Sequence, residues 1–346
     1  MNRSARLHGK GDFRVEDVPI PEIGPEDVLV QMAFVGMCRS DVHFFDEGHI
    51  DTFVVDKPMT LGHELSGVIS KVGAKVKGLK PGENVAVDNI QPCFQCKNCL
   101  DRRFNICSKL KCAGLPHVDG GYARFMATPA YTCHKLPENV SLQAGALMEP
   151  LSVTLHGLHR GKITPGEVVV VIGAGPIGLL TLQSAKALGA RKVLVVDINE
   201  KRLELAKSLG ADVIFNSSGH TDPEKTAEAI KAALEEEADL GVECTGAPGT
   251  INTAIYACRV GGRVVVQGIG DNIMSIHIGA AALREIDLIG SICNTDFPEA
   301  VELVAAGKVN VLPLITHVLP LENVTDGINL VRDGRRSIKV LIDCQK

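Results

Sequence analysis

Four cysteines fall within a short stretch in the first third of the chain, with the spacing Cys93-x2-Cys96-x2-Cys99-x7-Cys107. Four thiolates complete a tetrahedron around a zinc ion and leave no coordination position for a substrate. Two disulfides are the alternative, but clustered cysteines in a long intracellular chain more often bind metal. The spacing therefore predicts a structural zinc site in a lobe that spans residues 93–107.

A second set of possible metal ligands is scattered along the chain. Cys38 lies in GMCRSDVH, His63 and Glu64 lie in GHE, and Glu149 lies in MEP. Taken alone, a cysteine is usually a small buried side chain and a His-Glu pair usually lies on the surface. Together, one thiolate, one imidazole and one or two carboxylates form a zinc site with a free position for water or substrate. The combination favours a catalytic zinc, and the sequence leaves open which glutamate coordinates it.

A glycine-rich turn follows an apolar run that ends at residue 172. It reads GAGPIG and precedes a helical pattern, which is the context of a dinucleotide-binding fingerprint. Gly173 permits the tight turn, Gly175 lets the backbone approach a pyrophosphate, and Gly178 allows the helix to pack closely on the strand. Pro176 and Ile177 begin that helix, whose N-terminus attracts phosphate. A turn that binds nothing is the alternative interpretation.

Asp197 ends the next strand-like run, 19 residues after the third glycine. Its carboxylate is expected to accept hydrogen bonds from ribose hydroxyls and to repel a 2′-phosphate, so the predicted cofactor is NAD. Arg202 either pairs with Asp197 or contacts the ribose. Further cofactor contacts are expected where other strands of a parallel sheet end, with packing as the alternative role. The residues concerned are Val153, Cys244, Thr245, Gly268, Ile269, Cys293 and Asn294.

The elements that must position these residues follow two patterns. Before residue 150, short alternating runs such as 28–35, 65–72 and 83–87 are separated by turn signals, which predicts a mostly β domain. After residue 167, continuous apolar runs alternate with helical patterns, which predicts a parallel, doubly wound sheet and an α/β fold. Strands are expected at 168–173, 192–197, 212–215, 239–244, 263–268, 287–292 and 337–343, and helices at 176–189, 200–209, 222–237, 249–259, 297–307 and 321–333.

Length and charge limit the possible functions. A chain of 346 residues favours two domains, and the net charge of -5 provides no basic field for nucleic acid or an anionic membrane. No segment approaches the roughly 18 uninterrupted apolar residues of a membrane span. The N-terminal stretch lacks the apolar core of a secretion signal, so we expect a cytoplasmic protein with a small-molecule substrate.

These motifs together resemble the zinc-containing medium-chain dehydrogenases/reductases over essentially the whole chain. Within that superfamily, PMTLGHELSGVISKVG, MEPLSV, ECTGAP and LITHVLPLENV are most similar to sorbitol (polyol) dehydrogenases. The resemblance implies a GroES-like β catalytic domain at 1–152 and 291–346, and a Rossmann NAD-binding domain at 153–290. It also implies two zinc ions per chain, NAD as cofactor, and a homodimer or homotetramer.

The resemblance assigns roles to the scattered ligands. Cys38, His63 and Glu149 match the catalytic zinc positions of the family. Glu64 matches a residue that coordinates zinc directly in polyol dehydrogenases. Asp41 matches a carboxylate that holds the ligand imidazole in one tautomer. The two glutamates therefore count among the expected catalytic residues.

Other residues near Cys38 match the family in part. Ser40 and His43 match the proton relay of zinc alcohol dehydrogenases. Arg39 stands where polyol dehydrogenases usually have glycine, and alcohol dehydrogenases use an arginine there to contact the cofactor pyrophosphate. Phe44 replaces a tyrosine that is common in sorbitol dehydrogenases. The segment 290–295 is shorter than its polyol counterpart and lacks an Arg-Tyr pair, which indicates a different or smaller alcohol.

The implied activity is reversible, NAD-dependent oxidation of a secondary alcohol in a polyol to the ketose. An L-threonine, 2,3-butanediol or sugar-acid dehydrogenase of the same superfamily would share all these motifs. A protein that binds zinc and NAD without turnover belongs to a different class, and the intact Ser40, His43 and ligand set argue against it.

Overall fold

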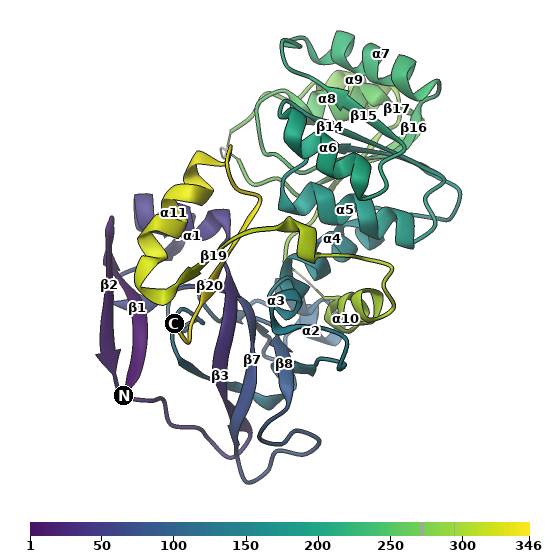
Figure 1. Ribbon diagram of the computed structural model, residues 1–346. Helices are drawn as coiled ribbons and strands as arrows, with labels where there is room; N and C mark the ends of the chain where they lie inside the picture. Colours follow the sequence, from purple (N-terminus) through teal and green to yellow (C-terminus); the bar gives the residue numbers. More distant parts are fainter. Residues whose placement is uncertain (271–272, 294) are drawn as a thin grey trace. The chain divides into compact units, whose positions relative to one another are not determined.

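The computed structural model describes residues 1–270, 273–293 and 295–346. The chain forms two compact units (Figure 1). Unit 1 comprises Met1–Glu149, Phe297–Ala305 and Val311–Lys346, and unit 2 comprises Pro150–Asp296 and Ala306–Asn310. The first division thus follows residue 149 where the sequence suggested 152, and the return to unit 1 begins at 297 where the sequence suggested 291.

The main sheet of unit 1 combines strands from both ends of the chain. Its order is β12-β8-β7-β3-β20-β19, and β11 also pairs with β3. Strand β20 runs antiparallel to β3, so the C-terminal segment completes a sheet that the N-terminal segment begins (Figure 1). The strands are β3 (Asp27–Gly36), β7 (Glu64–Val72), β8 (Asn84–Val87), β11 (Phe125–Pro129), β12 (Cys133–Lys135), β19 (Ile315–Pro320) and β20 (Lys339–Asp343).

Smaller elements surround this sheet. A second sheet has the order β2-β1-β6, and two short pairs join β4 with β5 and β9 with β10. These strands are β1 (Asn2–Gly9), β2 (Asp12–Val18), β4 (His49–Ile50), β5 (Phe53–Val54), β6 (Met59–Thr60), β9 (Ile90–Gln91) and β10 (Lys111–Cys112). The helices are α1 (Arg39–Glu47), α2 (Lys97–Leu100), α3 (Leu142–Gly145), α10 (Phe297–Ala305) and α11 (Val324–Asp333), with 3-10 turns η1 (Phe104–Ile106), η2 (Ala130–Thr132), η3 (Leu312–Leu314) and η4 (Leu321–Asn323).

The core of unit 1 depends on the alternation in β3. Val28, Val30, Met32 and Val35 are fully buried in one apolar cluster with side chains of β7 and β20. Full burial of such a side chain stabilises a fold by roughly 1.5–3 kcal/mol. This packing holds the end of β3 in place, and Cys38 lies two residues after its last residue, Gly36.

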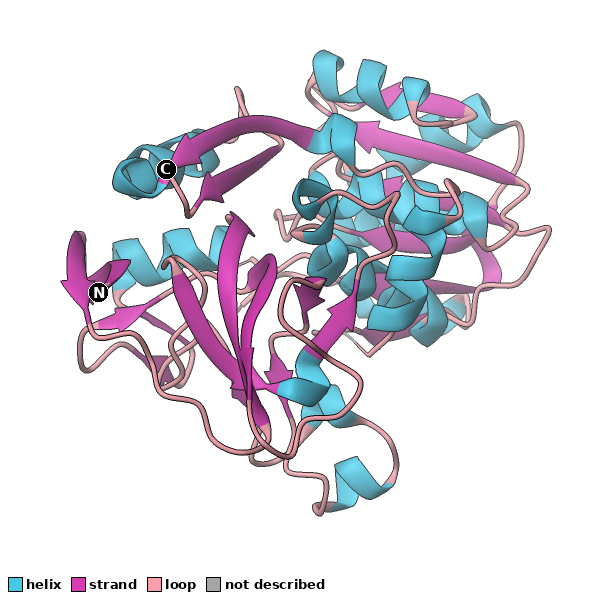
Figure 2. Cartoon of the chain, turned by 60° about the horizontal axis from the view of Figure 1, so that its bottom comes forward, coloured by secondary structure: helices cyan, strands magenta, loops and turns pink. Residues whose placement is uncertain are grey.

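Unit 2 contains a six-stranded parallel sheet of order β15-β14-β13-β16-β17-β18. This is the strand order of a dinucleotide-binding fold, in which strands are added first on one side of β13 and then on the other. In Figure 2 the helices of the unit (cyan) pack against its strands (magenta). The strands are β13 (Val168–Ile172), β14 (Lys192–Asp197), β15 (Val213–Asn216), β16 (Ala238–Glu243), β17 (Cys258–Val266) and β18 (Asp287–Gly290), and the helices are α5 (Pro176–Ala187), α6 (Glu200–Ser208), α7 (Pro223–Leu234), α8 (Thr250–Ala257) and α9 (Ile278–Leu283). Helix α4 (Met148–Arg160) crosses from unit 1 into unit 2.

The expected α/β fold class is confirmed, and the differences lie at element ends. The predicted helix 222–237 stops at Leu234 because Glu235 adopts a left-handed conformation with φ of 62°. The predicted helix 249–259 stops at Ala257, since Cys258 is extended and begins β17. Among the described residues, no helix combines the length and apolar character needed to span a bilayer.

Candidate functional site

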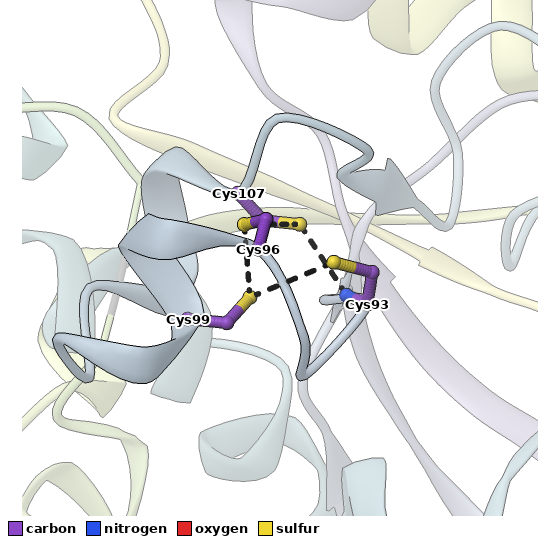
Figure 3. Close-up of side chains that lie close together, drawn as sticks. All are labelled: Cys93, Cys96, Cys99 and Cys107. Atoms are coloured by element: carbon purple, nitrogen blue, oxygen red, sulfur yellow. Dashed lines mark hydrogen bonds between the residues drawn. The ribbon is translucent and has the colours of Figure 1, made fainter.

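The cysteine lobe brings four free thiols face to face (Figure 3). Cys93 Sγ lies 4.0 Å from Cys99 Sγ, and Cys96 Sγ lies 3.5 Å from Cys99 Sγ. Cys107 Sγ lies 3.8 Å from Cys96 Sγ. Four sulfurs at about 2.3 Å from a zinc ion would lie roughly 3.8 Å apart at the corners of a tetrahedron. The lobe therefore fits a closed zinc site with no open position.

Backbone groups organise the lobe before any metal binds. The N–H groups of Cys93 and Lys109 each donate to Cys107 Sγ at 3.3 Å. A hydrogen bond from the backbone N–H of Cys99, together with others, lowers the pKa of the Cys96 thiol. The Cys96 thiolate, the form that binds zinc, is thereby favoured, whereas burial and the Cys96 side chain raise the pKa of the Cys99 thiol to about 12. The local sequence alone thus builds this site.

The second ligand set is assembled by strand pairing. Cys38 follows β3 and caps α1, whereas His63 and Glu64 stand at the start of β7. Strands β3 and β7 are antiparallel, with Gly36 opposite Glu64, so residues far apart in sequence meet. The donor atoms of Cys38, His63 and Glu64 lie within 4.8 Å of one another. This sulfur, nitrogen and oxygen set fits a zinc ion with a remaining open position.

A buried lysine that the sequence analysis missed contacts this set. Lys339, on β20, places its Nζ 2.6 and 2.7 Å from the two carboxylate oxygens of Glu64. It also donates to the Met37 carbonyl at 3.2 Å. Both charged side chains are almost fully buried, and a Cβ on Gly36 would lie 1.9 Å from Glu64 Oε2. A lysine within the apolar stretch SIKVLID was the available signal, because a buried lysine needs a partner.

Asp41 lies behind His63, as the family resemblance implied. Its carboxylate is fully buried, with Oδ1 at 3.7 Å from His63 Nδ1. Oδ2 accepts hydrogen bonds from the Cys38 N–H and from the Tyr122 hydroxyl, both at 2.9 Å. Burial alone would lower the pKa of His63, but Asp41 and Cys38 more than offset it, and the net pKa is raised. No motif in the sequence pointed to Tyr122.

Glu149 lies in the first turn of α4 and is also buried. Burial is the main reason why its pKa rises to about 7, and the neighbouring charge of Glu64 adds to the shift. Glu149 does not belong to the donor set within 4.8 Å that the structure forms from Cys38, His63 and Glu64. The structure therefore brings three of the four expected ligands together and leaves Glu149 outside that set.

Helix α1 carries the other residues expected near Cys38. Arg39 and His43 are exposed, and Ser40 is half-buried in the first turn. Phe44 is fully buried in the apolar core of unit 1. A tyrosine at position 44 would therefore place its hydroxyl in this buried core.

The glycine-rich turn has the geometry expected of a phosphate-binding loop. Gly173 has φ of 103°, and a Cβ there would lie 2.6 Å from Thr245 Cγ2. Gly175 caps α5, with Pro176 at the first helical position. A Cβ on Gly178 would lie 1.7 Å from the Gly173 carbonyl oxygen, so only glycine allows this contact. The loop and the following helix N-terminus, which includes Ile177, fit a pyrophosphate.

Asp197 ends β14 beside this loop. Its Oδ2 accepts the Ala174 N–H at 2.6 Å and its Oδ1 accepts the Asn199 N–H at 2.8 Å. Arg202, on α6, reaches the same loop, since a Cβ on Gly175 would lie 3.9 Å from its Nη1. An acidic and a basic side chain thus flank the glycine turn.

The ends of β16 and β17 also meet near the loop. A Cβ on Gly268 would lie 2.1 Å from the Gly246 nitrogen. The buried carboxylate of Glu243 accepts the N–H groups of Thr245 at 2.8 Å and Gly246 at 3.0 Å, so it shapes this turn. Ile269 is exposed beside it. Glu243 was not among the residues that the sequence analysis singled out.

The remaining expected cofactor contacts are less uniform. Val153 was expected where a strand ends, but it lies within helix α4, where its carbonyl accepts a hydrogen bond from Gln267 Nε2 at 2.8 Å. Burial raises the pKa of the Cys244 thiol. Cys293 adopts a left-handed conformation with φ of 56°. Asn294 lies outside the described residues.

Comparisons with known proteins agree with both parts of this description. An alcohol dehydrogenase GroES-like domain matches residues 24–138, and a zinc-binding dehydrogenase domain matches residues 176–306. Sorbitol dehydrogenase of Homo sapiens is 42% identical over 345 residues, which cover 99% of this chain and 96% of that protein. Two Escherichia coli structures are each 30% identical. One is an oxidoreductase of unknown specificity with a TM-score of 0.93, and the alignment covers 99% of each chain. The other is L-idonate 5-dehydrogenase with a TM-score of 0.90, and the alignment covers 99% of this chain and 98% of that chain.

Proposed function

Because this chain belongs to the zinc-containing medium-chain dehydrogenases/reductases, we propose that it reversibly oxidises a secondary alcohol of a polyol to the ketose, with NAD as hydride acceptor. The observation that carries this proposal is the convergence of the Cys38, His63 and Glu64 donor atoms within 4.8 Å. The identity to sorbitol dehydrogenase supports a polyol as substrate.

The chain's own ligands suit a hydroxyl substrate. Cys38, His63 and Glu64 hold the metal, and Glu149 is a nearby carboxyl that serves as the alternative oxygen ligand. When bound there, zinc supplies a Lewis acid that lowers the pKa of a coordinated hydroxyl, as it lowers the pKa of water from 15.7 to about 7. Lys339 limits how much of the Glu64 charge reaches the metal.

Removal of hydride from an alcohol carbon also releases the hydroxyl proton. Ser40 is half-buried and accepts this proton, and His43, three residues further along α1, is exposed and passes it to solvent. Arg39 is exposed at the start of α1, and we assign it to a cofactor phosphate.

The glycine turn of unit 2 holds the cofactor. Gly173, Gly175 and Gly178 cradle its pyrophosphate, while Asp197 receives the adenosine ribose hydroxyls beside Arg202. When bound, NAD supplies the hydride acceptor. Residues that follow the strands of the sheet shape the rest of its site, and they are Cys244, Thr245, Gly268, Ile269 and Cys293. Val153, on α4, is assigned to the same site.

A different alcohol is the second candidate. L-threonine, 2,3-butanediol and sugar acids are the alternative substrates, and the solved structures of L-idonate 5-dehydrogenase and of a 2R,3R-butanediol dehydrogenase are about equally similar to this chain. The short segment 290–295 and the buried Phe44 also depart from the pattern of polyol dehydrogenases.

A substrate panel tests the proposal. Purified protein is assayed with NAD and sorbitol, xylitol, 2,3-butanediol, L-threonine or L-idonate, with and without a zinc chelator. We expect the highest kcat/KM for a polyol, and a rate that the chelator abolishes. A rate confined to L-threonine would overturn the polyol assignment. Binding of NADH without any chelator-sensitive oxidation would overturn the enzymatic function itself.

Matched thiol variants accompany the panel. Cys38→Ser should remove most of the rate, since it replaces the soft ligand of the proposed metal. Cys133→Ser changes a thiol that belongs to neither ligand set, so its rate should stay near that of the unaltered protein.

We also propose a homodimer or homotetramer that works in the cytoplasm. Strand β18 ends the described sheet of unit 2, and its outer edge is open to pairing with a second copy. Exposed apolar side chains gather in the same part of the sequence, namely Val260, Ile269, Ile273, Ile276, Ile278, Leu283 and Ile292. A cytoplasmic location follows from the zinc-binding thiols, which stay reduced in that compartment.

A further inference from the structure

Asp41 has an asymmetric set of hydrogen bonds. Its Oδ2 receives both available donors, the Cys38 N–H and the Tyr122 hydroxyl, each at 2.9 Å. Its Oδ1 faces His63 Nδ1 at 3.7 Å, and within the described residues neither of these two atoms has a hydrogen-bond partner. A small shift of either side chain would therefore form a direct hydrogen bond between His63 Nδ1 and Asp41 Oδ1.

We propose that Tyr122 is a positioning residue of the zinc site, which acts through Asp41 on His63. This inference rests on the proposed function, since it requires His63 to bind zinc. Tyr122 itself belongs to neither ligand set, and its hydroxyl touches Asp41 only on the oxygen that faces away from His63.

The backbone fixes where the Tyr122 ring lies. The Tyr122 N–H donates to the Leu61 carbonyl at 3.1 Å, and the neighbouring Gly121 N–H donates to the Gly62 carbonyl at 2.9 Å. Gly62 has φ of 88°, and a Cβ there would lie 2.9 Å from the ring carbons of Tyr122. Because Gly62 directly precedes His63, the ring packs against the backbone that carries the ligand.

Packing holds the Tyr122 ring against Gly62. Tyr122 is fully buried, and its ring meets the edge of Phe13 with centroids 6.5 Å apart. A buried hydroxyl must find an acceptor, and Asp41 is the acceptor within reach. The hydroxyl therefore acts as a fixed donor in a dry environment, where such a bond is strong.

The direction of the hydrogen bonds to Asp41 determines which nitrogen of His63 can bind a metal. Two donors occupy Oδ2, so Oδ1 remains an acceptor for a proton on His63 Nδ1. The other ring nitrogen, Nε2, then keeps its lone pair for zinc. Loss of the Tyr122 hydroxyl would loosen Asp41 and hence the orientation of the imidazole.

The test is the rate at which Tyr122→Phe loses zinc. This substitution keeps the ring against Gly62 and removes only the oxygen. Zinc-loaded protein is mixed with excess of a chromogenic zinc chelator, and two phases of release are followed. We expect the phase that tracks loss of dehydrogenase activity to be about tenfold faster than in the unaltered protein. The phase from the four-cysteine lobe should not change.

Two further variants isolate the path through Asp41. Asp41→Asn should also release zinc faster, and adding Tyr122→Phe to it should cause no further acceleration, since both act through one carboxylate. Tyr256→Phe is the matched control, because its hydroxyl contacts His277 in unit 2 at 3.2 Å. It should release zinc like the unaltered protein.

The outcomes separate this inference from the proposed function. An unaltered protein that releases no zinc in step with loss of dehydrogenase activity would remove both. If it releases such zinc, equal release rates for Tyr122→Phe and the unaltered protein would overturn the role of Tyr122 and leave the dehydrogenase intact. Additive acceleration in the double variant would equally overturn the path through Asp41.

Discussion

At the scale of single residues, Asp197 has two tasks. Its two oxygens accept N–H groups from Ala174 in the glycine turn and from Asn199 before α6, so it orders the loop. In the proposed cofactor site, the same negative charge faces the position of the 2′-phosphate that NADP carries and NAD lacks. Two like charges at 4 Å repel by about 1 kcal/mol in water and by about 4 kcal/mol near a protein surface. Its charge should therefore decide between NAD and NADP.

We expect Asp197→Gly to change cofactor preference. The ratio of kcat/KM for NADP to that for NAD should rise by about two orders of magnitude, since the repulsion disappears and the contact with the ribose hydroxyls is lost. Initial rates with both cofactors measure the ratio. Glu204→Ala removes an exposed acid from α6 and controls for net charge. An unchanged ratio in Asp197→Gly would mean that the ribose binds elsewhere.

At the scale of elements, the C-terminal strand β20 serves both the fold and the site. It joins β3 to β19 in the sheet of unit 1, and its first residue, Lys339, neutralises Glu64. Removal of one partner of a buried ion pair leaves the other charge uncompensated, which typically costs about 3–5 kcal/mol. A zinc ion would provide an alternative partner for Glu64.

Lys339→Met should therefore destabilise the metal-free protein most. We expect the free energy of unfolding to fall by about 3–5 kcal/mol without zinc and by less when zinc is bound. Denaturant titrations of both forms measure the difference. Lys135→Met breaks a more exposed pair with Glu83 and should cost less than about 1 kcal/mol. Equal losses in both metal states would contradict the shared role of Glu64.

At the scale of the whole molecule, the apolar side chains around α9 and β18 suggest contact with a second copy. Leu283 is 89% exposed and Ile278 is 66% exposed, which is unusual for a group of large apolar side chains on one unit. An edge strand that pairs across a two-fold axis would cover both.

Leu283→Glu should lower the molecular mass in solution. A charge in an apolar interface must lose water without gaining a partner, so association should weaken by at least tenfold. Sedimentation or light scattering over a range of concentrations measures the mass. Leu100→Glu changes a 72% exposed leucine in the cysteine lobe and should leave the mass unchanged. A Leu283→Glu protein of unaltered mass would place the interface elsewhere.

The sequence by itself determined the sites whose residues are close along the chain. The four cysteines and the GAGPIG turn each lie within one short segment of the chain, so spacing and local backbone preference are sufficient to indicate them. The α/β fold class followed from the period of the apolar residues for the same reason. Cys38, which is far in sequence from His63 and Glu64, was proposed with them as a ligand through motifs that resemble a family.

Only the tertiary structure decided which distant groups meet. Lys339 contacts Glu64 across 275 positions, and Tyr122 contacts Asp41 across 81. Strand pairing brings Lys339 to Glu64, whereas backbone hydrogen bonds from Gly121 and Tyr122 to the segment before β7 place Tyr122 near the site. No local pattern of residue types records either contact. Glu149 falls outside the donor set for a related reason, because the path of α4 sets its position. Residue types in local motifs indicated the candidate ligands. The packing of buried charges and hydrogen-bond donors determined how each candidate ligand is held.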